Sequence, residues 1–500
     1  MKKIALPITL LFLLSLVSFS AIQADSKKGS VSQSPAKPVA PNVIIILTDD
    51  MTKASLSAMN QVNQQLVTKG TTFNHFFVSN ALCCPSRTST LRGQYAHNHG
   101  VLNNIPPDGG FQKAFSKGLE LSTLATWLQS VGYRTALFGK YLNGYPDKDN
   151  TYIPPGWNEW NALLNTEKMD NFSYNYRLNQ NGQLAKYGDK PTDYMTDVLA
   201  EKTIDFIRRN NDLSTPLFMY LATTAPHAPA IPAPRHANLF PRTTLPFKPS
   251  FNESDVSTKP KYIQKRKQLN QQQKDSIKGL YRKQLRSLQA VDEAVFNIMQ
   301  ELARTGRLDN TYIFFTSDNG LEFGEHRLPN GKGTPYEEAI SVPLVVRGPN
   351  IGIGREVNEI CANIDLAPTI AELAHAPITH IVDGRSLVPL LQSGTVNFWR
   401  HSLLLEHWPG RHEASPDDEF FIPQYMGLRS DHYLYVEYEG GERELYDLAL
   451  DPFELKNIYR VARPSLLQQL SLRLSQLKSC VGEDCRKAED LTIDDQIGLR

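Results

Sequence analysis

Residues 42–50, which read Asn-Val-Ile-Ile-Ile-Leu-Thr-Asp-Asp, indicate the fold class of this chain. The run Val43–Leu47 is continuously apolar and rich in β-branched residues, which is typical of a strand buried on both faces in a parallel sheet. Similar short runs recur at Thr135–Phe138, Leu217–Ala222, Tyr312–Phe315 and Leu344–Val346. Helical patterns lie between these runs, for example at residues 119–131 and from about 274 to 304. We therefore predict an α/β fold with a mostly parallel (mixed) sheet and helices on both faces.

The pattern changes after about residue 380. Short alternating segments follow one another there, namely HSLLLEHW (401–408), YMGLRS (425–430) and HYLYVEYE (432–439). Such alternation favours antiparallel strands with one buried face. We predict a large α/β domain at residues 42–379 and a smaller C-terminal α+β domain, with an antiparallel sheet, at residues 380–500.

The N-terminal segment has the pattern of a secretory signal peptide. Two lysines precede an apolar stretch from Ile4 to about Val17, and small residues follow up to Ala24. Residues 25–41 are rich in Ser and Pro, which is typical of a flexible leader. The remaining sequence has no apolar run of about 18 residues, so we expect an exported protein, periplasmic or secreted, without stable membrane insertion.

Composition excludes one class of partner. The 500-residue chain carries 53 Lys and Arg against 52 Asp and Glu, for a net charge of +1. This balance provides no general basic field, so we do not expect nucleic acid to be a partner. An anionic substrate would have to be held by local charges.

The five cysteines fall into different settings. Cys480 and Cys485 close a short loop, which export would allow to oxidise. Cys83 and Cys84 are adjacent, and a disulfide between neighbouring residues is strained and rare. The adjacent pair therefore needs another explanation.

Polar side chains follow two of the predicted strands. Asp49 and Asp50 come directly after the first strand, and Asp318 and Asn319 follow the strand at residues 312–315. Ligands of open α/β sheets collect at the carboxyl ends of the strands, and a set of oxygen donors suits Ca²⁺ or Mg²⁺. Taken alone, each pair is also compatible with a helix cap or a turn.

The segment CCPSRTSTLRG, residues 83–93, carries the most specific pattern. Pro85 fits the first turn of a helix, which would place Cys83 at a helix entrance where amide donors favour an anion. Without further context, a buried or redox-active cysteine pair that caps a helix would be the better explanation of the segment. The segment also matches the sulfatase signature Cys-x-Pro-Ser-Arg-x-x-x-Leu-x-Gly at every defined position. The chain thus resembles the type I sulfatases, the formylglycine-dependent members of the alkaline phosphatase superfamily.

This resemblance implies a nucleophile and a cofactor. In the family the first cysteine of the signature, here Cys83, is converted by a separate formylglycine-generating enzyme to formylglycine, whose hydrate attacks sulfur. The resemblance also implies a Ca²⁺ ion, with Mg²⁺ as the alternative, and its ligands would be Asp49, Asp50, Cys83 as formylglycine, Asp318 and Asn319.

Further segments resemble motifs of the family. They are Gly139-Lys140, Ala225–Pro229 (APHAP), Gly331–Glu337 (GKGTPYE) and the closing motif at residues 444–460, ELYDLALDPFELKNIYR. The first three imply that the active site contains Lys140, His227 and Lys332 together with Arg87. The closing motif implies a structural role in docking the smaller domain.

One position departs from the family. The histidine of its GKWH-type motif would fall at Leu142, since the sequence here is Gly-Lys-Tyr-Leu-Asn. Asn143 is a candidate for the catalytic polar role, and His97 or His99 are alternatives that could reach the site. The GKYLN form and the segment YIPPGW (152–157) look similar to N-acetylglucosamine-6-sulfatases and extracellular heparan endosulfatases.

The sequence therefore predicts a sulfuric ester hydrolase whose partner is a sulfated sugar, either N-acetylglucosamine-6-sulfate or a glycosaminoglycan. Two alternatives stay open. One is a phosphomonoester or phosphodiester hydrolase of the same superfamily, and the other is a noncatalytic glycan-binding homologue of sulfatases.

Overall fold

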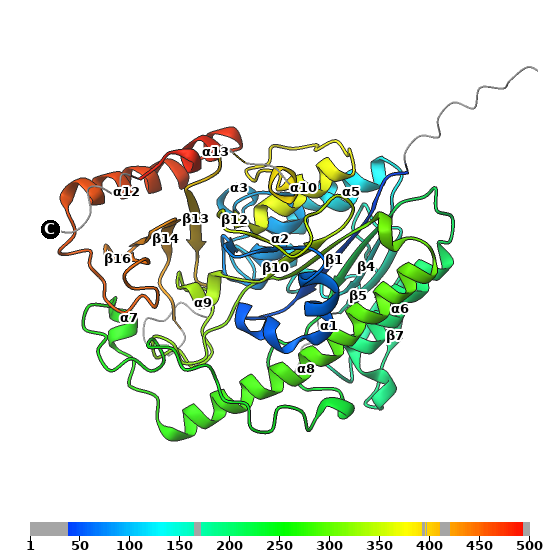
Figure 1. The fold of residues 1–500 in the computed structure, drawn as a ribbon, viewed down its shortest axis with the longest axis horizontal. Coiled ribbons are helices and arrows are strands. Elements are labelled where there is room, and N and C mark those ends of the chain that lie inside the picture. The colour runs from blue at the N-terminus through cyan, green and yellow to red at the C-terminus, as the bar shows by residue number, and fades with distance from the viewer. Residues whose placement is uncertain (1–38, 165–171, 393–395, 397, 411–420, 494–500) are drawn as a thin grey trace, which may run out of the picture. The chain divides into compact units, whose positions relative to one another are not determined.

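The computed structural model describes residues 39–164, 172–392, 396, 398–410 and 421–493 (Figure 1). The predicted signal peptide at residues 1–24 and the leader as far as residue 38 lie outside the described residues. Within the described ranges, no helix combines the length and the apolar character needed to cross a membrane.

A ten-stranded mixed sheet organises the larger part of the chain, which confirms the predicted α/β class. Five neighbouring strands at its centre are parallel, in the spatial order β9 (Thr311–Ser317), β1 (Asn42–Thr48), β8 (Leu217–Ala222), β4 (Arg134–Gly139) and β5 (Glu159–Leu163). Beyond β9 lie β10 (Leu344–Arg347), β2 (Thr71–Phe73) and β11 (Arg355–Val357). Beyond β5 lie β6 (Arg177–Gln180) and β7 (Gln183–Lys186). Antiparallel pairing is confined to β10 with its two neighbours and to the β5–β6–β7 edge.

The two faces of the sheet are both covered by helices. Alternate side chains of β1 point to opposite faces, so Ile45 joins one apolar cluster and Ile44 joins another. The Ile45 cluster includes residues of α2 (Cys83–Arg92), α5 (Leu124–Ser130) and α10 (Leu366–Leu373). The Ile44 cluster includes residues of α6 (Met195–Arg209) and α8 (Gln271–Arg304), which lie together along the sheet (Figure 1). Burying each isoleucine contributes roughly 1.5–3 kcal/mol, which explains why this apolar run becomes the central strand.

The predicted helix at residues 119–131 is interrupted. A 3₁₀ turn at Leu119–Leu121 precedes α5, and Thr123 between them has an extended backbone. The Thr123 amide donates to Oγ1 of Thr126 at 2.9 Å, so a local cap starts a new helix where the apolar spacing alone indicated continuity.

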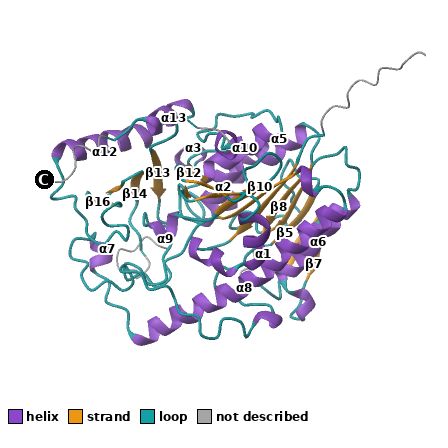
Figure 2. Cartoon of the chain, viewed as in Figure 1, coloured by secondary structure: helices purple, strands orange, loops and turns teal. Residues whose placement is uncertain are grey.

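A separate four-stranded antiparallel sheet follows near the C-terminus, as predicted (Figure 2). It consists of β13 (Ser402–His407), β14 (Tyr425–Ser430), β15 (Tyr433–Tyr438) and β16 (Arg443–Asp447). Helices α12 (Pro464–Leu477) and α13 (Glu483–Asp490) pack on it, and Cys480 and Cys485 form a disulfide beside them. The domain boundary at residue 380 stays a prediction.

Buried ion pairs join this smaller sheet to the larger part of the chain. The Arg400 guanidinium contacts both carboxylate oxygens of Asp365, at 2.5 and 2.7 Å, and Oε2 of Glu489 at 2.9 Å. Two parallel hydrogen bonds to one carboxylate fix its orientation as well as its distance. Removing one partner would leave a buried charge uncompensated, at a cost of about 3–5 kcal/mol.

The remaining elements are short. They are α1 (Asn60–Val62), β3 (Phe76–Phe77), α3 (Ala96–His99), α4 (Gly110–Ser116), α7 (Lys261–Gln264), α9 (Glu337–Ile340), β12 (Cys361–Ala362) and α11 (Val388–Leu391). Single turns of 3₁₀ or π helix lie at Lys53–Ala58, Asn63–Val67, Leu119–Leu121, Pro191–Asp193, Pro234–His236, Leu308–Asn310 and Asn363–Asp365.

Candidate active site

Four neighbouring parallel strands deliver polar side chains to one edge of the sheet. Asp318 follows β9, Asp49 follows β1, His227 lies in the loop after β8, and Lys140 follows β4. The backbone extends the strand pairing into this region, since the Asp318 amide donates to the Thr48 carbonyl at 3.1 Å. Parallel neighbours end at the same sheet edge, so residues that are distant in sequence come together there.

Asp50 is held in an uncommon backbone conformation. Its φ is 63°, which is the left-handed region that non-glycine residues seldom occupy. The Asp50 amide donates to Oδ1 of Asp318 at 3.1 Å, which supports this conformation. Such conformations concentrate at functional sites, where the surroundings enforce them.

Helix α2 begins at Cys83, as the position of Pro85 predicts. The amide of Cys84 in the first turn donates to Oδ1 of Asn104 at 2.8 Å. The helix ends at Arg92 and is capped by Gly93, whose φ of 68° suits glycine, and a Cβ at Gly93 would lie 3.0 Å from Pro368. The signature segment thus contains both ends of a buried helix, and Cys83 is the first residue of that helix.

The Cys83 thiol lies among charged groups. Its Sγ is 3.2 Å from Nζ of Lys332 and 3.6 Å from Oδ1 of Asp49. Burial raises the pKa of Cys83 to about 12, although Lys140 and Lys332 oppose the rise. The unmodified thiol is therefore protonated near neutral pH and is a poor nucleophile.

Cationic side chains contact the first two carboxylates. Nζ of Lys140 lies 2.5 Å from Oδ2 of Asp49, and Nζ of Lys332 lies 2.8 Å from Oδ1 of Asp50. Burial would raise the pKa of Asp49, but Lys140, His227 and Arg87 outweigh that effect and lower the pKa to about 2. For Asp50, burial is likewise outweighed by Lys332 and His227, and its pKa is lowered. Both carboxyl groups are thus anionic at neutral pH.

Arg87 contacts two of the three acidic side chains, those of Asp49 and Asp318. Its Nε donates to Oδ2 of Asp318 at 2.8 Å, its Nη1 donates to the Lys140 carbonyl at 3.0 Å, and Nη2 lies 3.5 Å from Oδ2 of Asp49. The side chain is fully buried. These contacts make Arg87 a positioning group for two carboxylates.

The donor set fits a hard divalent cation. Asn319 donates from Nδ2 to Oδ1 of Asp50 at 2.6 Å, and its Oδ1 is buried without a hydrogen-bond partner among the described residues. That free amide oxygen joins the carboxylates of Asp49, Asp50 and Asp318, and such all-oxygen sets suit Ca²⁺ or Mg²⁺. Ligand atoms of Asp49, Asp50, Cys83 and His227 also lie within 4.8 Å of one another.

Charge balance favours an anion once a cation is bound. The three carboxylates are matched by the three cations Lys140, Lys332 and Arg87. A bound divalent ion would leave a net positive charge, which attracts an anionic group. Solvent reaches the site from one side, because the side chains of Lys332 and His227 are 20% and 24% exposed while the carboxylates are buried.

The position of the missing family histidine is filled differently. Leu142 is buried, and the backbone of Asn143 hydrogen-bonds the Cys84 thiol and accepts from the Phe111 amide. The Asn143 Oδ1 atom is buried without a partner, and within the described chain no contact joins this side chain to Cys83.

The histidine alternatives do not reach the site. His97 contacts Oε1 of Glu406 at 2.6 Å and the Cys480 carbonyl at 2.9 Å. His99 contacts Oγ of Ser89 and the Val101 amide, each at 3.0 Å. Since both nitrogens of each ring are engaged elsewhere, the idea that either histidine replaces the missing one is wrong.

Sequence reasoning missed two supporting residues. Asn104 caps α2 through the contact described above, and the ring of Phe172 packs edge-on against His227 with centroids 5.0 Å apart. His227 also contacts the Ala228 carbonyl through Nδ1 at 2.7 Å, which leaves Nε2 directed toward Asp50 at 3.5 Å. Neither Asn104 nor Phe172 lies in a recognisable motif, so only spatial proximity reveals them.

Comparisons with known proteins show the family to which the chain belongs. The family model described as Sulfatase matches residues 41–376, and the one described as N-sulphoglucosamine sulphohydrolase, C-terminal, matches residues 324–480. The chain belongs to the sulfatase family. It is an enzyme of the sulfatase class, a sulfuric ester hydrolase.

Named relatives cover most of the chain. Human N-acetylglucosamine-6-sulfatase is 35% identical over 478 residues, which span 89% of this chain and 86% of the human protein. The extracellular sulfatase SULF-1 homologue of Drosophila melanogaster is 37% identical over 390 residues, which span 77% of this chain and 34% of that protein.

Solved structures share the fold. A protein solved in complex with its substrate D-glucosamine-2-N,6-O-disulfate superposes with a TM-score of 0.75 at 24% identity, covering 90% of this chain and 99% of that one. The phosphonate monoester hydrolase of Agrobacterium radiobacter superposes with a TM-score of 0.63 at 22% identity, covering 88% and 94%. At these identities the likeness extends to the fold alone.

Proposed function

We propose that this enzyme removes sulfate from a sulfated amino sugar, either N-acetylglucosamine-6-sulfate or a glycosaminoglycan, after Cys83 is converted to formylglycine. The observation that carries the proposal is the position of Cys83 at the start of α2. Its sulfur faces Lys332 and Asp49 beside a set of oxygen donors. A modified side chain at position 83 would lie next to the proposed cation site and to the partly exposed side chains of Lys332 and His227.

Formylglycine and the divalent cation would each supply a different kind of chemistry. The formylglycine hydrate would supply one hydroxyl as nucleophile and a second whose deprotonation expels sulfate, while Ca²⁺ or Mg²⁺ would supply positive charge at the reacting oxygens. The ligands proposed for the cation are Asp49, Asp50, Asp318, Asn319 and residue 83.

Lys140, Lys332 and Arg87 hold the carboxylates of the proposed cation site in place. Lys140 and Lys332 each contact one carboxylate, which leaves their remaining N–H donors for sulfuryl oxygens. Arg87 fixes Asp49 and Asp318, so the carboxylates do not need to reorganise when substrate binds. Preorganised donors of this kind stabilise developing charge more effectively than mobile water does.

We assign protonation of the departing alcohol to a partly exposed side chain of the site. His227 and Lys332 are the partly exposed members of the set, so a sugar leaving group would meet them first. The Nδ1 contact of His227 with the Ala228 carbonyl fixes the ring, and Nε2 is the atom that would donate the proton. Asn143 is proposed as the polar group that orients the hydrate, in place of the histidine of the family.

The substrate class rests on similarity and chemistry together. The human relative is named for N-acetylglucosamine-6-sulfate, and the Drosophila relative is named an extracellular sulfatase. The site provides an amide oxygen at Asn319, where a fourth carboxylate would raise the negative charge, and this favours a singly charged sulfate ester over a doubly charged phosphate ester.

Export is part of the same proposal. The extracellular relative agrees with a location outside the cytoplasm, where a sulfated polysaccharide would be met. We assign residues 1–24 as a signal peptide cleaved after Ala24. N-terminal sequencing of the exported protein tests this assignment, and a mature chain that still begins at residue 1 would contradict it.

The experiment for the function measures released sulfate from a panel of sulfated mono- and oligosaccharides. The enzyme is produced with a formylglycine-generating enzyme, and Cys83→Ala is the inactive control. We expect the highest kcat/KM on 6-sulfated N-acetylglucosamine and little turnover of matched phosphate and phosphonate monoesters. Faster turnover of the phosphorus esters would favour the alternative hydrolase class, and sugar binding without release from the converted enzyme would favour the glycan-binding alternative.

A further inference from the structure

A second group of potential metal ligands lies buried outside the active site. His326 belongs to the loop between β9 and α9, Glu338 lies in α9, and Glu454 lies in the loop after β16. The side chains are 0%, 6% and 1% exposed. One ligand atom from each residue lies within 4.8 Å of the other two. Three distant segments therefore converge on one interior point.

The spacing of these atoms fits metal ligands better than hydrogen-bond partners. Nε2 of His326 lies 3.7 Å from Oε2 of Glu338 and 3.8 Å from Oε2 of Glu454. Both separations exceed the usual hydrogen-bond range, and among the described residues neither Nε2 of His326 nor Oε2 of Glu338 has a partner within hydrogen-bonding distance. Tetrahedral ligands about 2.0–2.2 Å from a zinc ion lie about 3.3–3.6 Å from each other, so shifts of roughly 0.1–0.5 Å would bring these atoms to zinc-binding distances.

The second ring nitrogen of His326, Nδ1, contacts a carboxylate. Nδ1 of His326 lies 2.5 Å from Oε1 of Glu253. A proton on Nδ1 that is donated to this carboxylate leaves the lone pair of Nε2 directed toward Glu338 and Glu454. Metal-bound histidines commonly make this second contact, which fixes the tautomer and the ring orientation. The ammonium of Lys259 lies 3.7 Å from the same Glu253 oxygen and 3.0 Å from Nδ1.

The surroundings carry an excess of buried carboxyl groups. The network contains two lysines, Lys248 and Lys259, and five carboxyl groups, namely Glu253, Glu322, Glu325, Glu338 and Glu454. Burial raises the pKa of Glu322 to about 8 and also raises the pKa of Glu325, so not every one of these groups is charged at neutral pH. A divalent cation would pair with the carboxylates that are charged.

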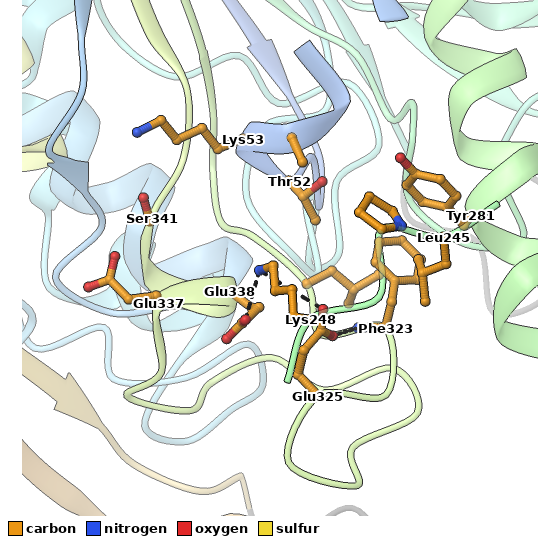
Figure 3. A pocket seen from close by; sticks show the side chains of 13 residues that line it. Thr52, Lys53, Leu245, Lys248, Tyr281, Phe323, Glu325, Glu337, Glu338 and Ser341 are labelled. Carbon is orange, nitrogen blue, oxygen red and sulfur yellow. Dashed lines mark hydrogen bonds and ion pairs between the residues drawn. The ribbon is translucent and has the colours of Figure 1, made fainter. Parts of the chain in front are cut away.

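A route from solvent reaches one of the ligands. A cavity of about 390 Å³ is lined by Lys248, Glu325 and Glu338 on one side and by Tyr281 and Phe323 on the other (Figure 3). Lys248 contacts Oε1 of Glu338 at 2.7 Å, while the opposite oxygen of that carboxylate faces His326. An ion could therefore enter past Glu338.

We propose that His326, Glu338 and Glu454 bind a Zn²⁺ ion with a structural role, at a site distinct from the Ca²⁺ or Mg²⁺ site beside Cys83. One imidazole and two carboxylates form a donor set that zinc accepts. The ion would tie the closing motif, which contains Glu454, to the loop between β9 and α9, which contains His326, and to α9, which contains Glu338. The proposal does not depend on the identity of the sulfate ester.

The test is a zinc titration of the full-length protein, followed by removal of unbound metal and elemental analysis. We expect one zinc per chain in the wild type and in Asp318→Asn, which alters only the active-site donors. Glu454→Gln and His326→Gln should bind zinc at least about tenfold more weakly. Retention of zinc in both variants, or its absence from the wild type, would overturn the proposal.

A spectroscopic measurement covers the case in which the variants fail to fold. Wild-type protein loaded with zinc should show only nitrogen and oxygen neighbours in X-ray absorption, with an imidazole contribution. Sulfur neighbours would place the metal on a cysteine and would contradict the assignment. If His326 is instead an imidazolium in an ion-pair network, added zinc will leave the unfolding temperature unchanged, and this result also overturns the proposal.

Discussion

Nζ of Lys332 lies 3.2 Å from Sγ of Cys83 and also contacts the Asp50 carboxylate. The lysine thus joins the proposed nucleophile position to a proposed metal ligand. Replacing its charge with the isosteric Lys332→Met should lower kcat by about 10²–10³-fold, as for other preorganised donors. Steady-state sulfate release measures the effect, with the exposed Lys267→Met as a matched control. Equal activity of the two variants would remove Lys332 from the mechanism.

The neighbouring cysteines should differ in importance. Conversion of Cys83 to formylglycine lowers the intact mass by about 18 Da, and hydration restores it. We expect Cys83→Ala to abolish turnover while the protein stays folded, and Cys84→Ala to retain substantial activity because position 84 is variable in the signature. Mass spectrometry and circular dichroism accompany the sulfate assay. An active Cys83→Ala enzyme would contradict the assignment.

Chelation should remove activity reversibly. Asp49, Asp50, Asp318 and Asn319 offer oxygen donors only, so Ca²⁺ or Mg²⁺ should restore the chelated enzyme. Asp318→Asn should weaken metal binding and lower turnover, and its elemental analysis provides the check. A wild-type enzyme that keeps full activity with neither metal bound would show that no hard cation is needed.

Asn143 is predicted to orient the hydrate of residue 83. Its Oδ1 atom is buried and has no hydrogen-bond partner in the described part of the chain, so it is available to accept a hydrogen bond when the modified residue is present. Loss of this contact in Asn143→Ala should cost on the order of a hundredfold in kcat, whereas KM should change little. Turnover within about tenfold of wild type would instead favour a site that relies on the cation alone.

His97 should make stability depend on pH. Burial lowers its pKa, but Glu406 outweighs burial and raises the pKa from 6.5 to about 9. Because the folded-state pKa is the higher one, the stabilisation is fully present below pH 6.5 and is lost as the pH rises toward 9. The contribution is at most about 3 kcal/mol. We expect His97→Gln to unfold at a lower temperature than wild type at pH 6, with a smaller difference at pH 9.5.

Local patterns in the sequence were enough for the class of fold and for much of the candidate site. The apolar run at residues 43–47 predicts a central strand because a strand buried on both faces needs a continuous apolar sequence. Asp49 and Asp318 could be predicted as neighbours because the ends of parallel strands meet at one edge. The signature at residues 83–93 is likewise a contiguous pattern.

Contacts between distant segments required the folded chain. Phe172 against His227 and Asn104 on the first turn of α2 have no local pattern, since neither spacing nor composition marks them. The alternative that His97 reaches the active site fails for the same reason, because its partners Glu406 and Cys480 are distant in the sequence. His326, Glu338 and Glu454 look like surface residues in the sequence. Packing in the folded chain buries their side chains together. Because buried polar atoms without partners cost free energy, the distances between these atoms affect stability.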